Sequence, residues 1–282
     1  MPQRLAFKVV VAMVFIGALM SAASTHSARA TAPKPIRWLL HGPGIAAIAA
    51  DGEVSRLLDN TQPFVMTGRN FAAIPPGWNA IPFASFTSFR AIKSSLDRGA
   101  LAPAVKGVMY DNEKWRFTPE EEQLNPARYE KFAADLVHAH GLLFLSAPAV
   151  DLVAVLAPES DERRYDSYLR LGIVADAARY ADIIDIQAQG SERNTRAYAD
   201  FVGQAAVQAR QANPNVLVLA GISTNPSGQR VRADDILRAI AATRDNVDGY
   251  WFNIPRPSEY CPRCNDFRSD IAIEVIRRLA AS

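Results

Sequence analysis

The sequence has few of the residues from which metal and redox sites are built. Two cysteines and four histidines occur in 282 residues, and His26 falls within the first 30. A structural zinc ion takes four Cys or His ligands in most proteins, and after residue 30 only His41, His138 and His140 remain beside the two cysteines. We therefore expect neither a metal nor a cofactor.

Other signatures are also missing. Dinucleotide-binding folds carry G-x-G-x-x-G after their first strand, whereas Gly42-Pro43-Gly44 is too short and too constrained by proline to serve. No internal repeat and no low-complexity segment interrupts the chain. These absences exclude a nucleotide-binding sheet and leave a large globular domain.

Residues 1–30 resemble an export signal. Arg4 and Lys8 precede an apolar run, Val9 to Met20, of about a dozen residues, which is short for a membrane span. Ala28-Arg29-Ala30 fits the small-x-small cleavage pattern. We predict a signal peptide over 1–30, a secreted or periplasmic location and no stable membrane association after cleavage. An uncleaved N-terminal anchor is the alternative.

Without that segment the charges balance. Removing Arg4, Lys8 and Arg29 from the 31 basic residues leaves 28, against 29 acidic ones. A near-neutral protein offers no electrostatic footprint for nucleic acid or for an anionic membrane. We therefore expect no nucleic-acid partner, and the sequence does not indicate an oligomeric state.

Both cysteines lie in Cys261-Pro262-Arg263-Cys264. In an exported protein such a pair is expected to form a disulfide, here one that closes a tight loop. A redox centre or half of a zinc site are the alternatives. The position near the C-terminus argues against a thioredoxin-like unit.

Short apolar segments alternate with helical ones along residues 31–282. The expected strands are 36–40, 64–67, 81–86, 105–111, 142–145, 182–189, 215–222 and 247–254, and the main expected helices are 89–96, 125–140, 165–180, 195–211, 234–243 and 270–279. In the helix that ends near His140, Tyr129, Phe132, Ala133, Leu136 and Val137 share one stripe. Strand–helix alternation over about 250 residues predicts one α/β domain, a (β/α)8 TIM-type barrel.

The strand Val105–Asp111 is the centre of the predicted site. If the chain stays extended, Asp111, Glu113 and Trp115 point to the same side. Two neighbouring carboxyl groups disfavour each other's charge, so the pKa of one should rise, which keeps a general acid protonated. The alternative is a solvated acidic turn.

Polar residues also end the later strands. They are Asp185, Gln187 and Gln189 after one strand, Asn225 after the next, and Trp251 and Asn253 on the last. The carboxyl ends of barrel strands build active sites. Either these groups satisfy one another in a hydrogen-bonded layer, or they bind a polyhydroxylated ligand, a carbohydrate, with Tyr110, Trp115 and Trp251 as aromatic partners.

The segment Gly107-x-x-x-Asp111-x-Glu113 resembles the end of the chitinase-type signature of family 18 glycoside hydrolases, and more loosely other barrel glycosidases. Trp251 resembles the tryptophan that floors the sugar subsite in that family. The resemblance implies a general acid/base role for Glu113 and orientation of a substrate N-acetyl group by Asp111, a substrate-assisted route. The resemblance covers only about nine residues of the motif and one tryptophan. Met109 replaces the family's additional aspartate, Asn112 stands where an aromatic is frequent, and Gln187-Ala188-Gln189 occupies the place of a later aromatic–aspartate pair.

We therefore predict an exported glycoside hydrolase with Glu113 as proton donor. A conventional mechanism that pairs Glu113 with Asp185 or Asp151 stays open. The rivals are a non-catalytic carbohydrate-binding barrel, and a metal-dependent hydrolase that uses Asp111, Glu113 and His41. The scarcity of histidine makes the metal-dependent hydrolase the least favoured.

Overall fold

From residue 37 to residue 280 strands alternate with helices, except between the strands 64–67 and 81–86, where no helix is described. The computed structural model describes residues 35–281 except 42, 68–73, 227–228, 259–260 and 265. The predicted signal peptide, 1–30, lies outside these residues. Within the described part of the chain, no helix has the length and apolarity needed to cross a membrane.

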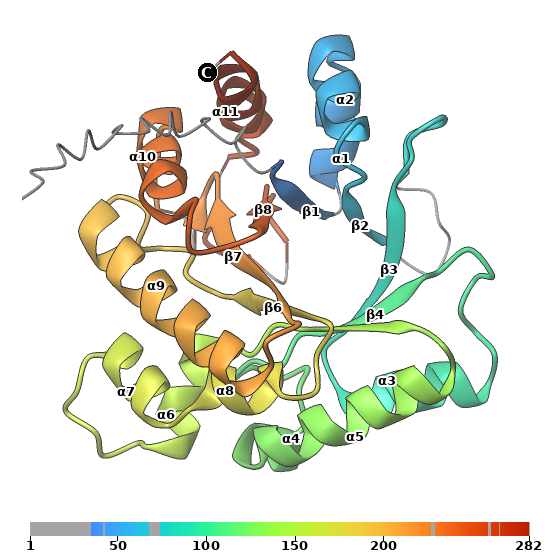
Figure 1. Ribbon diagram of the computed structural model, residues 1–282, viewed down its shortest axis with the longest axis vertical. Helices are drawn as coiled ribbons and strands as arrows, with labels where there is room; N and C mark the ends of the chain where they lie inside the picture. The colour runs from blue at the N-terminus through green and yellow to red at the C-terminus, as the bar shows by residue number, and fades with distance from the viewer. Residues whose placement is uncertain are drawn as a thin grey trace, which may run out of the picture. The chain divides into compact units, whose positions relative to one another are not determined.

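Eight parallel strands close into a barrel in sequence order (Figure 1). They are β1 (Arg37–His41), β2 (Phe64–Thr67), β3 (Ile81–Phe86), β4 (Gly107–Tyr110), β5 (Leu143–Ser146), β6 (Ile183–Ile186), β7 (Leu217–Ser223) and β8 (Gly249–Asn253). Strand β8 pairs with β1 and completes the ring. The predicted single (β/α)8 barrel is confirmed.

Helices cover the outside of the ring. They are α1 (Pro43–Ala49), α2 (Gly52–Asp59), α3 (Phe89–Asp97), α4 (Glu120–Leu124), α5 (Pro126–Ala139), α6 (Val153–Leu156) after the 3-10 turn η1 (Val150–Leu152), α7 (Arg164–Arg170), α8 (Ile173–Ala178), α9 (Thr195–Ala212), α10 (Ala233–Thr243) and α11 (Ser269–Ala280). Neighbours in sequence pack together from α8 to α11, and α11 also packs on α1 and α2. The helix expected over 165–180 is two helices, α7 and α8, because Gly172 adopts a left-handed φ of 68° between them.

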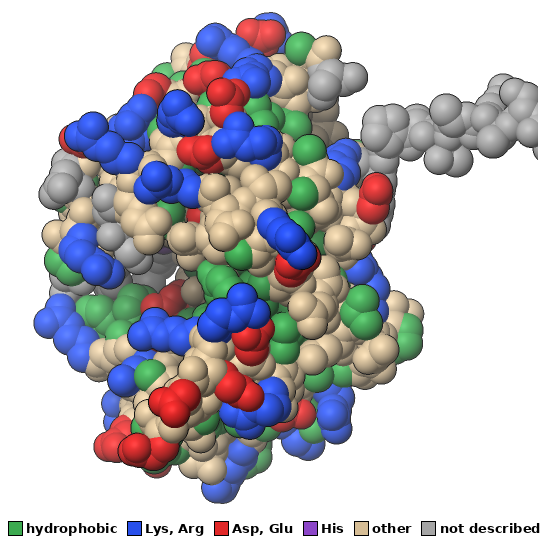
Figure 2. Space-filling model, turned by 90° about the vertical axis from the view of Figure 1, so that its left-hand side faces the viewer, with side chains coloured by type: hydrophobic (Ala, Val, Ile, Leu, Met, Phe, Trp, Pro, Cys, Tyr) green, Lys and Arg blue, Asp and Glu red, His purple; other side chains and the backbone are tan. Residues whose placement is uncertain are grey.

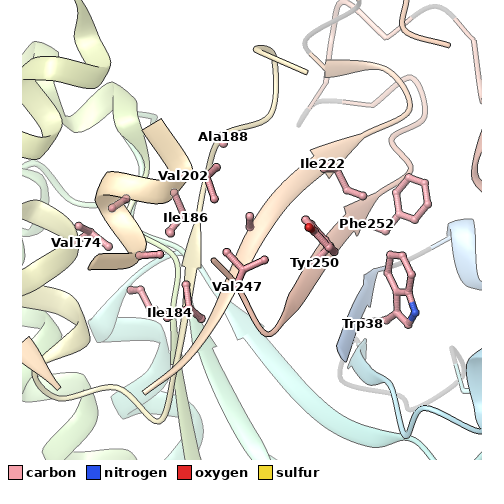
Figure 3. Packing of buried hydrophobic residues seen from close by; sticks show 14 of the residues in the cluster. Trp38, Val174, Ile184, Ile186, Ala188, Val202, Ile222, Val247, Tyr250 and Phe252 are labelled. Carbon is pink, nitrogen blue, oxygen red and sulfur yellow. The ribbon is translucent and has the colours of Figure 1, made fainter. Parts of the chain in front are cut away.

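The outward faces of the strands form the main core with the helices (Figure 3). Trp38 of β1 stacks on Phe252 of β8 with ring centroids 5.9 Å apart, and Tyr250 lies beside them. Ile184 and Ile186 of β6 contribute to the same core. Since side chains alternate along a strand, the odd-numbered neighbours of these residues face the barrel axis.

The inside of the barrel is a second, smaller apolar cluster. Its members include Leu39, Phe64, Phe83, Met109, Leu145, Ile183, Leu219 and Trp251. Gly107 permits this packing, because a Cβ there would lie 2.2 Å from the Phe83 ring. Apolar side chains therefore fill the barrel near the start of the strands, and polar ones follow toward the strand ends.

The stripe expected on the helix before His140 was wrong in part. The buried face of α5 is Glu130, Ala133, Ala134 and Val137, whereas Phe132 is 37% exposed. These buried positions have helical spacing. The apolar pattern gave the wrong stripe because the first residue of the buried face is a glutamate, Glu130.

Candidate functional site

Asp111 and Asp185 lie level with each other across three strands at the carboxyl ends. Tyr110 pairs with Ser146, and Ser146 pairs with Ile184, so the next residues of the three strands are Asp111, Ala147 and Asp185. The Ala147 amide donates to the Tyr110 carbonyl and extends this ladder by one residue. The small Ala147 side chain leaves space between the two acids inside the barrel mouth, which we define as the end formed by the carboxyl ends of the strands.

Gln187 ties the acids to the wall. Its Nε2 donates to Asp111 Oδ1 at 2.8 Å and to the Ala147 carbonyl, also at 2.8 Å. The Glu113 and Asp111 carboxyl groups share a hydrogen bond. Asp111 is buried and Glu113 is half-buried. The carboxyl ends of β4 and β6 thus bring together four predicted residues, Asp111, Glu113, Asp185 and Gln187, which we call the mouth cluster.

Burial and mutual repulsion raise the pKa of both members of the acidic pair. The pKa of Asp111 rises to about 7, because of burial first and the charge of Asp185 second, while hydrogen bonds from Gln187 and Glu113 oppose the rise. Burial, then the charges of Asp111 and Asp151, raise the pKa of Glu113 well above its usual range. The two raised pKa values favour one proton retained on the Asp111–Glu113 pair near neutral pH.

Asp185 is the deepest acid of the mouth cluster. Its side chain is 0% exposed, and neither carboxyl oxygen has a hydrogen-bond partner among the described residues. Burial raises the pKa of this carboxyl well above its usual range. A buried carboxylate without a partner is costly, so burial opposes ionisation of Asp185, and the charge of an ionised Asp185 in turn opposes ionisation of Asp111.

The β6 loop brings a second amide into the mouth. A Cβ on Gly221 would lie 2.3–2.5 Å from the Gln189 amide group, so the absence of a side chain on β7 makes room for it. Glu192, in the same loop, is completely buried and accepts from the Gly190 and Ser223 amides. Asn253, half-buried, ends β8 beside Ser223.

The three predicted aromatic contacts lie in different surroundings. Tyr110 faces the helices, is 0% exposed, and donates its hydroxyl to Glu122 Oε2 at 2.8 Å; an even-numbered residue of β4 cannot face the axis with Asp111. The chain turns after Glu113, and Trp115 donates its indole N–H to Thr118. Trp251 lies in the middle of β8, 6% exposed, within the barrel.

Asn225 is also occupied. It is buried, and its Nδ2 donates to the Asp266 carbonyl, tying the end of β7 to the loop after β8. Cys261 and Cys264 form a disulfide in that loop, as predicted. Within the described residues, no group of three or more His, Cys, Asp or Glu side chains is arranged to hold a metal ion, so the alternative that used His41 has no ligand set there.

Sequence reasoning missed a second set of polar residues behind the barrel wall. Glu122 of α4 accepts from the amides of Phe89 and Arg90, and its carbonyl accepts from Asn112 Nδ2. Glu130 of α5 lies beside Ser146. We call Tyr110, Asn112, Glu122, Glu130 and Ser146 the wall cluster. These residues are polar but lie on strand faces or helix faces that pack against the core. A pattern read from one sequence assigns such polar residues to solvent.

One face of the molecule is hollowed, and an acidic side chain lies recessed in the hollow with hydrophobic and basic side chains around it (Figure 2). The described fold is thus a barrel with an acidic pair at the carboxyl ends of its strands, the end at which barrel enzymes carry their active sites.

No family model matches the sequence, and no curated protein does. Among solved structures, the chain is similar to a Bacteroides thetaiotaomicron protein proposed to be an α-L-fucosidase, with 10% identity over 95% of this chain and 98% of that chain and a TM-score of 0.54. It is also similar to a GH18 chitinase from Pseudoalteromonas aurantia, with 12% identity over 87% and 99% of the two chains and a TM-score of 0.49. The triosephosphate isomerase of Bartonella henselae has 13% identity, the same coverage and a TM-score of 0.45. The likeness with a TM-score of 0.54 agrees with the barrel fold.

Proposed function

We propose that this protein is an exported glycoside hydrolase with Glu113 as general acid/base. The observation that carries the proposal is the paired carboxyl group: Glu113 is half-buried, hydrogen-bonded to Asp111, and has a raised pKa. A carboxyl group that stays protonated near neutral pH at the mouth of a barrel can donate a proton to a leaving group.

In the proposed reaction Glu113 protonates the glycosidic oxygen as the bond from that oxygen to the anomeric carbon breaks. Water then adds to the anomeric carbon, and the Glu113 carboxylate takes up the proton that water releases. The products are two sugars with free hydroxyl groups, and Glu113 returns to its protonated state. Asp111 accepts the Glu113 hydrogen bond and stabilises positive charge that develops on the sugar.

The groups near Asp111 and Glu113 indicate which nucleophile attacks in the first step. Asp185 is completely buried at the level of Asp111, so its carboxyl group is not exposed at the barrel mouth. Asp151 accepts from the Lys114 amide at 2.9 Å. The substrate's own N-acetyl oxygen, oriented by Asp111, fits this arrangement, as the resemblance to family 18 implies. Gln187, Gln189 and Asn253 supply amide groups for sugar hydroxyls.

A carbohydrate-binding protein without activity is less well supported. A binder depends on exposed aromatic platforms, whereas Trp251 is inside the barrel and Trp115 bonds Thr118. Binding of a carbohydrate without cleavage does not need a carboxyl group with a raised pKa, such as that of Glu113.

The test is hydrolysis of a panel of N-acetylated and plain β- and α-linked glycans by the wild type and by Glu113→Gln. We expect the wild type to release reducing ends from at least one glycan and the variant to bind that glycan without cleaving it. Equal cleavage by the variant, or no cleavage of any glycan by the wild type, would refute the proposal.

A further inference from the structure

The two halves of the barrel mouth carry opposite charge. The loops after β4 and β5 hold six acids, Asp111, Glu113, Asp151, Glu159, Asp161 and Glu162, against Lys114, Arg116 and Arg163. The loops after β6, β7 and β8 hold six arginines, against Glu192, Glu259 and Asp266. The sequence from residue 31 on is close to neutral, so this separation is local to the mouth.

Four arginines of the basic half have no ion pair or hydrogen bond with any described residue. Arg193 follows β6, Arg230 follows β7, and Arg256 and Arg263 follow β8; all four are exposed. We call them the arginine arc. Arg232 and Arg268, in the same loops, pair with Asp235 and Asp270. Most arginines on the helices are also paired, for example Arg238 with Asp235 and Arg278 with Asp234.

Two arc residues are held near the top of β7. Arg193 follows Glu192, whose buried carboxyl group accepts from the Ser223 amide. Arg263 precedes Cys264, which is 1% exposed and disulfide-bonded, and the Asp266 carbonyl accepts from Asn225. These bonds tie the arginine-bearing segments to the end of β7, where the Gln189 amide packs against Gly221.

We propose that the arginine arc binds anionic groups of the substrate, so that the ligand is a glycan carrying carboxylate or sulfate. This rests on the proposed function for its location, since the same mouth holds the acidic pair. A guanidinium presents a planar fork of N–H donors that matches a carboxylate or sulfate. Such groups lying against the basic half leave the glycosidic bond facing Glu113 on the acidic half.

A polyphosphate chain fits less well. Nucleic acid places a negative charge on every residue of the polymer and needs a continuous basic track. Here the track stops at the acidic half, where six acids face three bases. Spaced anionic groups on an otherwise neutral sugar chain match the separation of charge better.

The experiment measures binding to Glu113→Gln full-length protein by calorimetry at low and high salt. The probes are hyaluronan, which carries a carboxylate on alternate sugars, chondroitin sulfate, which adds spaced sulfate groups, neutral dextran of similar length, and single-stranded DNA. We expect one or both anionic glycans to bind at least about tenfold more tightly than dextran and to weaken with salt, as exposed charge pairs do.

Within that background, Arg230→Ala/Arg256→Ala should weaken binding of the anionic glycan about tenfold, from two exposed charge pairs. Arg98→Ala is the matched control, because Arg98 is exposed but lies before β4, at the opposite end of the barrel. An equal loss in the control, equal affinity for dextran, or tighter binding of DNA would overturn the inference.

The outcomes separate the two proposals. Binding of an anionic glycan without hydrolysis of any glycan by the wild type refutes the glycosidase and keeps the arc. Hydrolysis of neutral glycans with no preference for anionic ones refutes the arc and keeps the glycosidase.

Discussion

The mouth cluster and the wall cluster lie on opposite sides of the barrel wall around β4, and they differ in their access to a ligand. Both contain carboxyl groups with raised pKa values, Asp111 and Glu113 on one side and Glu130 on the other. Glu113 is half-buried at the barrel mouth, whereas Glu130 is 1% exposed between β5 and α5. A shifted pKa therefore marks burial in both places, and only access to a ligand makes one of them a candidate for catalysis.

The clusters also differ in how their acids are satisfied. Glu122 in the wall accepts three hydrogen bonds, from two amides at the start of α3 and from the Tyr110 hydroxyl. Asp185 in the mouth accepts none from the described residues. The hydrogen bonds of the wall cluster hold α3 and α4 on the barrel. The mouth cluster, in contrast, has carboxyl oxygens on Asp185 that accept no hydrogen bond from the described residues.

The largest expected difference is in activity. Glu113→Gln should lower kcat/KM by about 10²–10⁴, the usual contribution of a general acid. The matched variant Glu130→Gln should stay within a few-fold of the wild type. Initial rates on the glycan identified in the panel measure both. A comparable loss in Glu130→Gln would remove the distinction between the clusters.

The second expected effect is on stability. The pKa of Glu130 rises to about 8, because of burial first and the charge of Glu122, with Ser146 opposing. The folded state thus keeps a proton that the unfolded chain loses above about pH 4.5. The Glu130 contribution is fully present below that pH and declines by a few kcal/mol as pH rises to about 8.

Glu130→Gln should remove this decline, so that the variant gains stability relative to the wild type as pH rises from 5 to 8. Urea unfolding at several pH values measures the free energy of unfolding. A constant difference between the two proteins over that range would show that Glu130 titrates normally.

A third effect should appear only in the pH profile of activity. The charge of Asp185 is the second cause of the raised pKa of Asp111. Asp185→Asn should therefore lower that pKa and move the acid limb of kcat/KM, which we assign to ionisation of Asp111, from near pH 7 to lower pH. An unmoved acid limb would indicate that Asp185 does not act on Asp111.

The smallest expected effect concerns Tyr110. Tyr110→Phe removes one donor to Glu122 and should cost about 1–3 kcal/mol of stability, with KM unchanged because the hydroxyl faces the helices. A raised KM without loss of stability would favour the sequence-based prediction that Tyr110 binds substrate.

The sequence predicted the barrel well because its signal is repeated. Strands such as 64–67 and 81–86 were placed with their observed bounds, and the alternation of strands with helices continues to α11. Prediction was weaker where a polar residue is buried: Glu130 was missed on α5 and the stripe was drawn through Phe132. Burial of a charged side chain depends on partners from other elements, and no local pattern contains them.

Alternation along the strands determined by itself that Asp111, Asp185 and Gln187 face the barrel axis, since side chains of a strand alternate and the outward positions are apolar. The tertiary structure alone decided which of the proposed site residues meet. Ala147 separates the two aspartates, Gly221 makes room for Gln189, and the turn after Glu113 takes Trp115 to Thr118. These outcomes depend on the register between strands and on the path of the loops, which link residues far apart in the chain and are set by packing of the whole barrel.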